Sequence, residues 1–170
     1  EEGRMQIRQS AELVDEVIKE ALKHTGQSRT GRTIKVEEED ELILAKMDAR
    51  LIVQVLINLI GNAVKYTPQG TDITVRVKKE KAENAERSQV IISVCDLGNG
   101  IPDDRKERVF DMFYTGSDQV ADSRRSLGLG LGLCRSIINA HGGKIWISDN
   151  IPHGAVVTFT LPAEEVALNE

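Results

Sequence analysis

Three short segments of this chain carry side chains and glycines that could do chemistry. In the first, Asn58, Asn62 and Lys65-Tyr66 follow one another at helical spacing and form a polar stripe in an otherwise apolar stretch. Two stacked carboxamide oxygens can hold a hydrated Mg²⁺, because this ion prefers oxygen ligands and keeps several waters. Lys65 can reach a phosphate as a point charge. Taken alone, the stripe is more simply explained as a solvated helix face.

The second segment, Asp96-Leu97-Gly98-Asn99-Gly100-Ile101-Pro102, follows an apolar run. A carboxylate at a strand end can accept a hydrogen bond from an exocyclic amine, and glycines let a flat ring lie against the backbone. In isolation it is equally an ordinary turn. The third segment is the Gly-Leu alternation at 126–133, before a helical pattern. Free N–H groups and partial positive charge at a helix start suit a phosphate, although a glycine-rich turn alone is a weak signal.

Strands and helices must position these segments. Helices are expected at 11–23 with Ser10 as N-cap, at 49–66 with Asp48 as N-cap, and at 129–141. Strands are expected at 33–37, 42–45, 73–77, 89–95, 144–148 and 155–161. The charged stretch 78–88 predicts an exposed turn, and 97–128 a long loop with a short helical segment near 103–110. This order predicts an α/β (α+β) two-layer sandwich, a mixed sheet with about three helices on one face.

Composition and charge are those of an ordinary globular domain. The 170 residues are 40% hydrophobic and carry a net charge of −5 without a basic stripe, which argues against nucleic-acid binding. Cys95 and Cys134 lie in apolar runs, so buried free thiols are expected rather than a disulfide. No apolar run approaches the ~18 residues that span a bilayer, and the N-terminus resembles no signal peptide, so a soluble chain without direct membrane contact is expected.

Four motifs in order resemble the Bergerat-fold ATP-binding domain of sensor histidine kinases, a fold shared with gyrase. The N box corresponds to 54–68, the G1 box to 96–102, the F box to 110–113 and the G2 box to 128–133. Residues 154–162 resemble the closing strand of such domains, and 134–143 resemble the Kdp-type potassium-responsive kinases. The likeness covers 11–162, so we expect 1–10 to be the end of a linker from an absent helical-hairpin domain and 163–170 to be a frayed tail.

The resemblance implies roles for the matching residues, with ATP and Mg²⁺ as ligands. Asn62 would ligate the metal, Asn58 would support the metal or the phosphates, and with Lys65 they would form the catalytic set. Asp96 would accept the adenine amino group, the G2 glycines would hold the triphosphate through their N–H groups, and a lid arginine would steady the γ-phosphate. The other implied ATP-binding residues are Tyr66, Gly98, Gly100, Ile101, Phe113, Arg124, Arg125, Leu127, Gly128, Gly130, Leu131, Gly132, Leu133 and, near the base, Thr158.

One position separates branches of this superfamily. Members that hydrolyse ATP with water carry a Glu one helical turn before the metal-binding Asn, and here Asn58 stands there, a carboxamide that cannot act as a general base. The resemblance therefore favours a protein-histidine kinase that transfers the γ-phosphoryl group by positioning and charge neutralisation. The alternatives are a nucleotide-binding regulatory module without transfer, an anti-sigma-type serine kinase and a hydrolytic ATPase.

None of the three histidines fits a phosphoacceptor motif. His24 ends a helix, His141 precedes Gly142-Gly143 at another helix end, and His153 lies in a turn, so structural or solvated roles are expected. The chain is therefore expected to bind ATP with Mg²⁺ but not to phosphorylate itself. Its partner would be a histidine-bearing dimerisation domain, with a response regulator as an indirect partner, in the cytoplasmic part of an inner-membrane sensor kinase.

Overall fold

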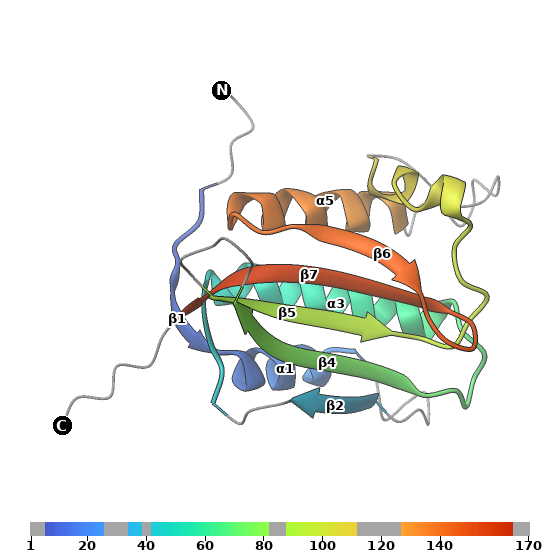
Figure 1. Cartoon of the computed structure of the whole chain (residues 1–170), viewed down its shortest axis with the longest axis horizontal. Helices are drawn as coiled ribbons and strands as arrows, with labels where there is room; N and C mark the ends of the chain where they lie inside the picture. Colours follow the sequence, from blue (N-terminus) through green and yellow to red (C-terminus); the bar gives the residue numbers. More distant parts are fainter. Residues whose placement is uncertain (1–5, 26–33, 39–41, 82–87, 112–126, 165–170) are drawn as a thin grey trace.

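One layer of strands and one layer of helices make up the chain (Figure 1). The computed structural model describes residues 6–25, 34–38, 42–81, 88–111 and 127–164. The strands are β1 (Ser10–Leu13), β2 (Ile34–Glu38), β3 (Leu44–Met47), β4 (Ile73–Lys81), β5 (Ser88–Cys95), β6 (Ile145–Asp149) and β7 (Ala155–Glu164). The helices are α1 (Val14–Lys23), α3 (Ala49–Lys65) and α5 (Leu127–Ala140), with the short 3-10 turns η1 (Asp103–Arg105) and η2 (Arg108–Phe110).

The strands form one seven-stranded mixed sheet in the order β1-β3-β7-β5-β4-β2, with β6 paired to β7 off this path. Among the described strands, only β2 and β4 run parallel. The long strand β7 connects the sheet, because it pairs with β5 on one side and with β6 and then β3 on the other. The mixed sheet predicted from the sequence is confirmed.

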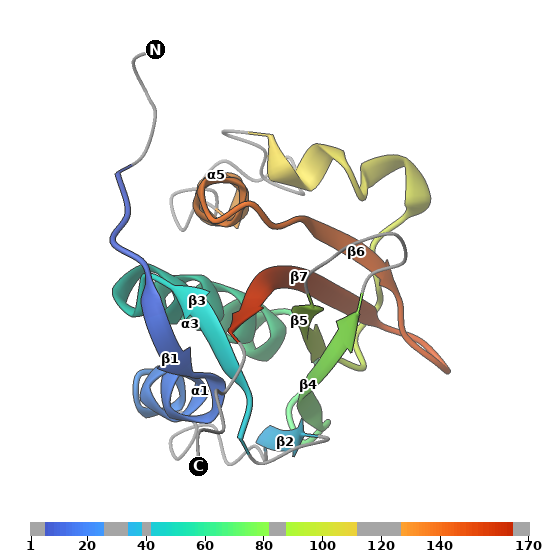
Figure 2. The ribbon, with the colours of Figure 1, turned by 60° about the vertical axis from the view of Figure 1, so that its left-hand side comes forward.

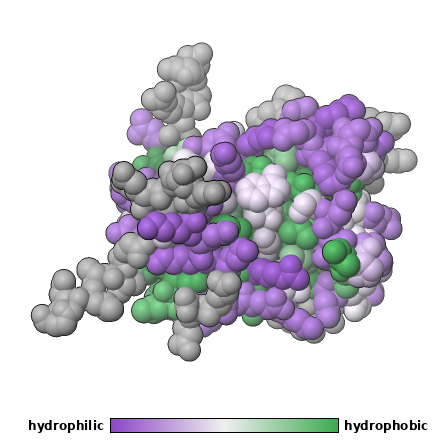
Figure 3. Space-filling model, viewed as in Figure 1, coloured by the Kyte–Doolittle hydropathy of each residue, from purple (hydrophilic) through white to green (hydrophobic). Residues whose placement is uncertain are grey.

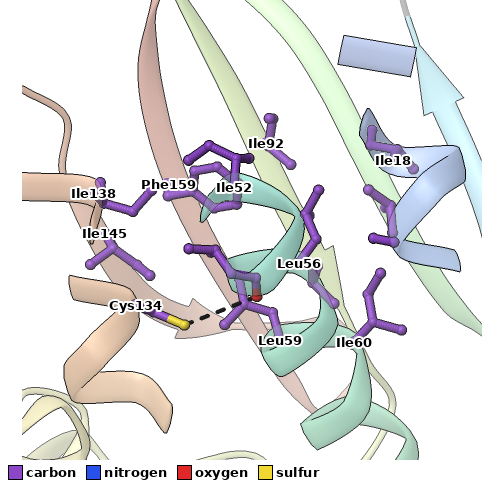
Figure 4. Packing of buried hydrophobic residues seen from close by; sticks show 14 of the residues in the cluster. Ile18, Ile52, Leu56, Leu59, Ile60, Ile92, Cys134, Ile138, Ile145 and Phe159 are labelled. Carbon is purple, nitrogen blue, oxygen red and sulfur yellow. Dashed lines mark hydrogen bonds between the residues drawn. The ribbon is translucent and has the colours of Figure 1, made fainter. Parts of the chain in front are cut away.

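The three described helices lie on one face of the sheet (Figure 2). Helix α3 packs on β4 and β5, α5 packs on β7, and α1 packs beside α3. Side chains alternate between the two faces of a strand, so Ile92 of β5 and Phe159 of β7 point into the core and are fully buried. Figure 4 shows these two residues packed against Ile52 and Leu56 of α3.

The other face of the sheet carries no described helix, and Figure 3 shows hydrophilic residues around a middle strip of pale and hydrophobic ones. It carries exposed charged side chains such as Lys35 of β2 and Arg76 of β4, and the partly exposed Trp146 of β6. In the described part of the chain, no helix combines the length and the apolar character that crossing a bilayer requires.

The first expected helix begins later than predicted. Residues 11–13 form β1, which pairs with β3, and α1 starts only at Val14. Ser10 does not cap the helix, because its hydroxyl donates to Glu12 and Leu13 takes the N-cap position. The apolar residues of this stretch fit either element, and pairing with β3 decides between them.

Two strands are longer than predicted. Residues 78–81, expected in an exposed turn, continue β4 and pair with 88–91 of β5. Ala163 and Glu164, expected in a frayed tail, pair with Ala45 and Leu44 of β3. The backbone ladder holds these segments extended although their side chains give no strong strand signal.

Asp48 stands at the N-cap of α3 as predicted, but its carboxylate makes no capping hydrogen bond. Its Oδ2 accepts the backbone N–H of Arg8 at 3.0 Å and lies 3.3 Å from the guanidinium of Arg50. Its own N–H donates to Nε2 of His141 at 3.0 Å, and Nδ1 of His141 lies 2.7 Å from the carbonyl of Ile137. His141 therefore joins the end of α5 to the start of α3, and the structural role expected for it is confirmed.

Candidate functional site

The C-terminal half of α3 forms one wall of the candidate site. Asn58, Asn62 and Lys65 fall on one side of this helix, while Leu59, Ile60 and Ala63 point into the core. Both asparagines are half-buried and Lys65 is exposed. The polar stripe predicted from the spacing therefore exists and borders solvent.

Asn58 lies between α3 and α5. Its Nδ2 is 3.7 Å from Sγ of Cys134, and a Cβ added at Gly130 would lie 3.4 Å from its Oδ1. Burial raises the pKa of the Cys134 thiol to about 12, so the sulfur is protonated at neutral pH. The thiol points toward α3, where the Val55 carbonyl lies 4.0 Å away (Figure 4). Asn58 thus fixes the spacing between α3 and the first turns of α5.

Asn62 is placed differently. Its side chain makes no hydrogen bond to any residue that the structure describes, so its carboxamide oxygen is available to a ligand. Neutral oxygen donors suit Mg²⁺, which binds proteins through few side chains and keeps waters and ligand phosphates. Within the described ranges, no three His, Cys, Asp or Glu residues come together as a metal site. What the residues present can offer such an ion is one neutral oxygen, from Asn62.

The loop after β5 forms the second wall of the candidate site, in contact with the end of α3. Oδ1 of Asp96 accepts the backbone N–H of Gly98 at 2.9 Å and of Ala155 at 3.1 Å. Oδ2 accepts no hydrogen bond from the described residues. Two amides therefore hold the carboxylate in place and leave one oxygen for an external donor.

Gly98 lets this loop press against the end of α3. A Cβ at Gly98 would lie 2.8 Å from the methyl group of Thr67 and 3.1 Å from the carbonyl oxygen of Tyr66. Because real Cβ atoms avoid such distances, a larger residue would push the loop away from α3. Thr67 is itself held, since its hydroxyl donates to the Ala63 carbonyl at 2.6 Å. Asp96 is thereby placed beside the end of the helix that carries Asn62 and Lys65.

The turn between β6 and β7 supports the same loop, and sequence reasoning missed it. Nδ2 of Asn150 donates to the backbone carbonyl of Asp96 at 2.6 Å, and Nδ1 of His153 lies 2.9 Å from the Gly98 carbonyl. Gly154 has a φ of 115°, and a Cβ there would overlap the Asp96 carbonyl. The polar residues before Gly154 were the available signal, but only the fold shows what they contact.

The Gly-Leu run forms the first turns of α5. The helix begins at Leu127, two residues before the predicted start, so Gly128, Gly130 and Gly132 are helical. The first N–H groups of a helix have no intrahelical partner and are suited to an anion. Leu131 is 4% exposed and belongs to the core, whereas Leu133 is 44% exposed. Within this run, the side chain of Leu131 therefore serves packing.

Thr158 is not brought to this site. Its neighbour Phe159 faces the helices, so Thr158 faces the open side of the sheet, where its hydroxyl lies 2.9 Å from that of Ser93. The expectation that Thr158 lies near the base is therefore wrong, because alternate residues of β7 face opposite sides of the sheet and Thr158 is on the side away from the helices.

Other predicted site residues are near the two walls or outside the described part. The ammonium of Lys65 lies 5.2 Å from the centre of the Tyr66 ring, at the end of α3. Gly100, with a φ of 78°, and Ile101 continue the loop after Asp96, and the Ile101 carbonyl accepts Nζ of Lys106 at 2.8 Å. The predicted residues that lie outside the described ranges are Phe113, Arg124 and Arg125.

Comparison with known proteins finds that one protein family matches most of the chain. The family described as "Histidine kinase-, DNA gyrase B-, and HSP90-like ATPase" matches residues 47–165. Sensor protein KdpD of Clostridium acetobutylicum is 38% identical over 164 residues, which are 96% of this chain and 18% of that protein. The adaptive-response sensory kinase SasA of Crocosphaera subtropica is 34% identical over 94% of this chain and 41% of its own length. The chain thus spans less than half the length of these relatives.

Solved structures share the fold. The catalytic domain of histidine kinase ThkA matches with a TM-score of 0.75 and 30% identity, over 92% of this chain and 98% of that one. ThkA in complex with response regulator protein TrrA matches with a TM-score of 0.72 and 30% identity, over 92% of this chain and 42% of that one. The mycobacterial sensor histidine kinase MprB, at 21% identity and a TM-score of 0.75, matches over 94% of this chain and all of that chain. The predicted α/β sandwich is confirmed by these likenesses.

Proposed function

The chain belongs to the family of histidine kinase-, DNA gyrase B- and HSP90-like ATPases, and from this premise we propose a specific role for it. It is the ATP-binding catalytic domain of a sensor histidine kinase, and it donates the γ-phosphoryl group to a histidine on a separate dimerisation domain. The family's description as ATPases supports ATP as the nucleotide. The sensor kinases among its relatives, and ThkA in complex with a response regulator, support two-component signalling. Such a domain would work in the cytoplasm, as part of a membrane-bound sensor.

The observation that carries the proposal is the unshared Oδ2 of Asp96 beside the end of α3. Adenine presents an amino group that can donate to this oxygen, whereas guanine presents a carbonyl oxygen at the corresponding position. Two acceptors facing each other repel, so the carboxylate selects adenine. Gly98 leaves no side chain between the carboxylate and Tyr66.

The polyphosphate would extend from the base toward α5. Lys65 offers a positive charge, Asn62 an oxygen ligand for Mg²⁺, and the first turn of α5 its N–H groups. A bound Mg²⁺ would neutralise part of the negative charge of the phosphates. Asn62 and Lys65 orient the nucleotide, and the transfer of the γ-phosphoryl group depends on this orientation.

Asn58 favours transfer to a protein side chain over hydrolysis. A carboxamide cannot take a proton from water, and this one is engaged with Cys134 in the interface between α3 and α5. Water would therefore be a poor acceptor at this site. The γ-phosphoryl group is kept for a partner nucleophile.

Two measurements test the proposal. Titration calorimetry should detect ADP binding that strengthens with Mg²⁺, and no binding to a folded sample would overturn the proposal.

The second measurement uses γ-labelled ATP and the separately prepared histidine-bearing hairpin domain. Acid-labile label should appear on the hairpin. An acid-stable phosphoprotein would indicate a serine kinase. Steady ADP release without a partner would indicate a hydrolytic ATPase, and nucleotide binding without transfer would indicate a regulatory module. Each of these three outcomes would overturn histidine transfer.

A further inference from the structure

We infer that the turn between β6 and β7 positions the base-selecting carboxylate, with Asn150 and His153 as positioning residues for Asp96. The inference rests on the proposed function, because it assigns Asp96 to the adenine base. Neither residue stands in the four motifs that suggested the site. Both act on the loop after β5 across the end of the sheet, far from Asp96 in the sequence.

Asn150 holds the start of that loop. Its Nδ2 donates to the Asp96 carbonyl at 2.6 Å, and its Oδ1 accepts the N–H of Ile151 at 2.8 Å. Its own N–H donates to the Gly154 carbonyl at 3.0 Å, which closes the turn. Both ends of the carboxamide are thus occupied, so the side chain has one fixed orientation, and the Asp96 backbone is fixed with it.

His153 holds Gly98, which lies two residues after Asp96. Nδ1 lies 2.9 Å from the Gly98 carbonyl, and because a carbonyl only accepts, Nδ1 carries the proton. Both the neutral ring protonated at Nδ1 and the imidazolium satisfy this bond. The N–H of the same Gly98 donates to Oδ1 of Asp96 at 2.9 Å, so His153 is one residue removed from the carboxylate.

The turn also packs directly against the loop. Gly154 lies so close to the Asp96 carbonyl that a side chain would overlap it, and the N–H of Ala155 donates to Oδ1 of Asp96. On the far side of the loop, Lys106 contacts the Ile101 carbonyl and lies 2.9 Å from Asp149 at the end of β6. The loop is therefore held at both ends by the β6–β7 hairpin. These contacts fix the backbone of Asp96 and, with it, the direction in which Oδ2 points.

Asn150→Ala and His153→Ala test the inference, with Ile151→Ala as the matched control. The Ile151 side chain belongs to the same turn and is 88% exposed, so its removal leaves the loop unchanged. Loss of one hydrogen bond should weaken ADP binding about threefold to tenfold and lower the preference for ADP over GDP, with Ile151→Ala like the parent. His153→Asn, whose amide can replace the Nδ1 donor, should restore the preference.

Amide hydrogen exchange gives a second readout that needs no nucleotide. Exchange at Gly98 should accelerate in Asn150→Ala and His153→Ala and remain slow in Ile151→Ala. An unchanged preference for ADP in folded alanine variants would overturn the inference, as would unchanged Gly98 exchange. A parent that binds no ADP would overturn the proposed function instead, and the exchange measurement would still decide whether the turn holds the loop.

Discussion

The carboxamide of Asn58 is 3.7 Å from the thiol of Cys134, and this contact ties the polar stripe of α3 to the glycine run that begins α5. Gly130 makes the approach possible, because the space that its Cβ would take borders Oδ1 of Asn58. Helices α3 and α5 are thus held at one spacing by a residue that the family resemblance assigned to the metal or the phosphates. Asn58 has a packing role whether or not it contacts the nucleotide.

Asn62→Ala should remove the effect of Mg²⁺ on nucleotide binding while leaving the fold intact. The side chain makes no hydrogen bond within the described residues, so the free energy of unfolding should change by no more than about 0.5 kcal/mol. Loss of one oxygen contact should weaken Mg²⁺-dependent ADP binding about tenfold. Titrations with and without the metal measure this, and equal Mg²⁺ dependence in parent and variant would rule out the metal assignment.

Asp96→Asn should lower the discrimination between adenine and guanine nucleotides. The asparagine oxygen can still accept the N–H groups of Gly98 and Ala155, but an amide replaces the unshared Oδ2. That amide donates to the guanine carbonyl and repels the adenine amino group. The ratio of ADP to GDP affinities should fall about tenfold or more by calorimetry. A parent protein that binds ADP and GDP equally would contradict the role of this carboxylate.

His141→Ala should strongly destabilise the fold. His141 is 3% exposed and its ring is hydrogen-bonded at both nitrogens, so loss of the ring leaves the buried N–H of Asp48 without its acceptor, while the Ile137 carbonyl keeps the backbone N–H of residue 141. The free energy of unfolding should fall by about 2–4 kcal/mol, measured by urea denaturation. His24→Ala is the control: His24 is exposed and its ring pairs with the exposed Glu20, so the change should stay within about 0.5 kcal/mol.

Stability should fall in acid partly through Asp48. The hydrogen bond from the Arg8 amide holds the pKa of the Asp48 carboxyl below its ordinary value of 3.8, with the nearby Arg50 adding to it. A carboxyl with a lower pKa in the folded state stabilises the fold above its unfolded pKa, and this stabilisation is lost as the pH falls through the folded pKa. Thermal melts from pH 6 to pH 2 should therefore show a shallower acid decline in Asp48→Asn than in the parent. A decline of equal steepness would remove Asp48 from the acid response.

Cys134 should resist alkylation until the protein unfolds. Its pKa of about 12, raised by burial, leaves almost no thiolate at pH 8, and the thiolate is the reactive form. Cys95 is also buried with a raised pKa, so neither cysteine should react with iodoacetamide in the native state. Mass spectrometry with and without urea measures this. Rapid native labelling at Cys134 would contradict the packing of α3 against α5.

Local spacing made much of the fold and part of the site predictable. The apolar stripe of α3 and the positions of Asn58, Asn62 and Lys65 follow from helical periodicity alone, and the structure confirms the helix. The strands β5 and β6 were predicted within one residue at each end. The extension of β4 through charged residues was not predictable, because its stability comes from pairing with β5 and not from its own side chains.

What the amino-acid order determined by itself is which residues share a helix face and which motifs follow one another. The face that Thr158 presents, the strand formed by residues 11–13, and the contacts of Asn150 and His153 with the Asp96 loop were decided only by the tertiary structure. The physical reason is that a one-residue change of strand phase reverses every side chain. Contacts between segments far apart in sequence likewise depend on how the sheet assembles.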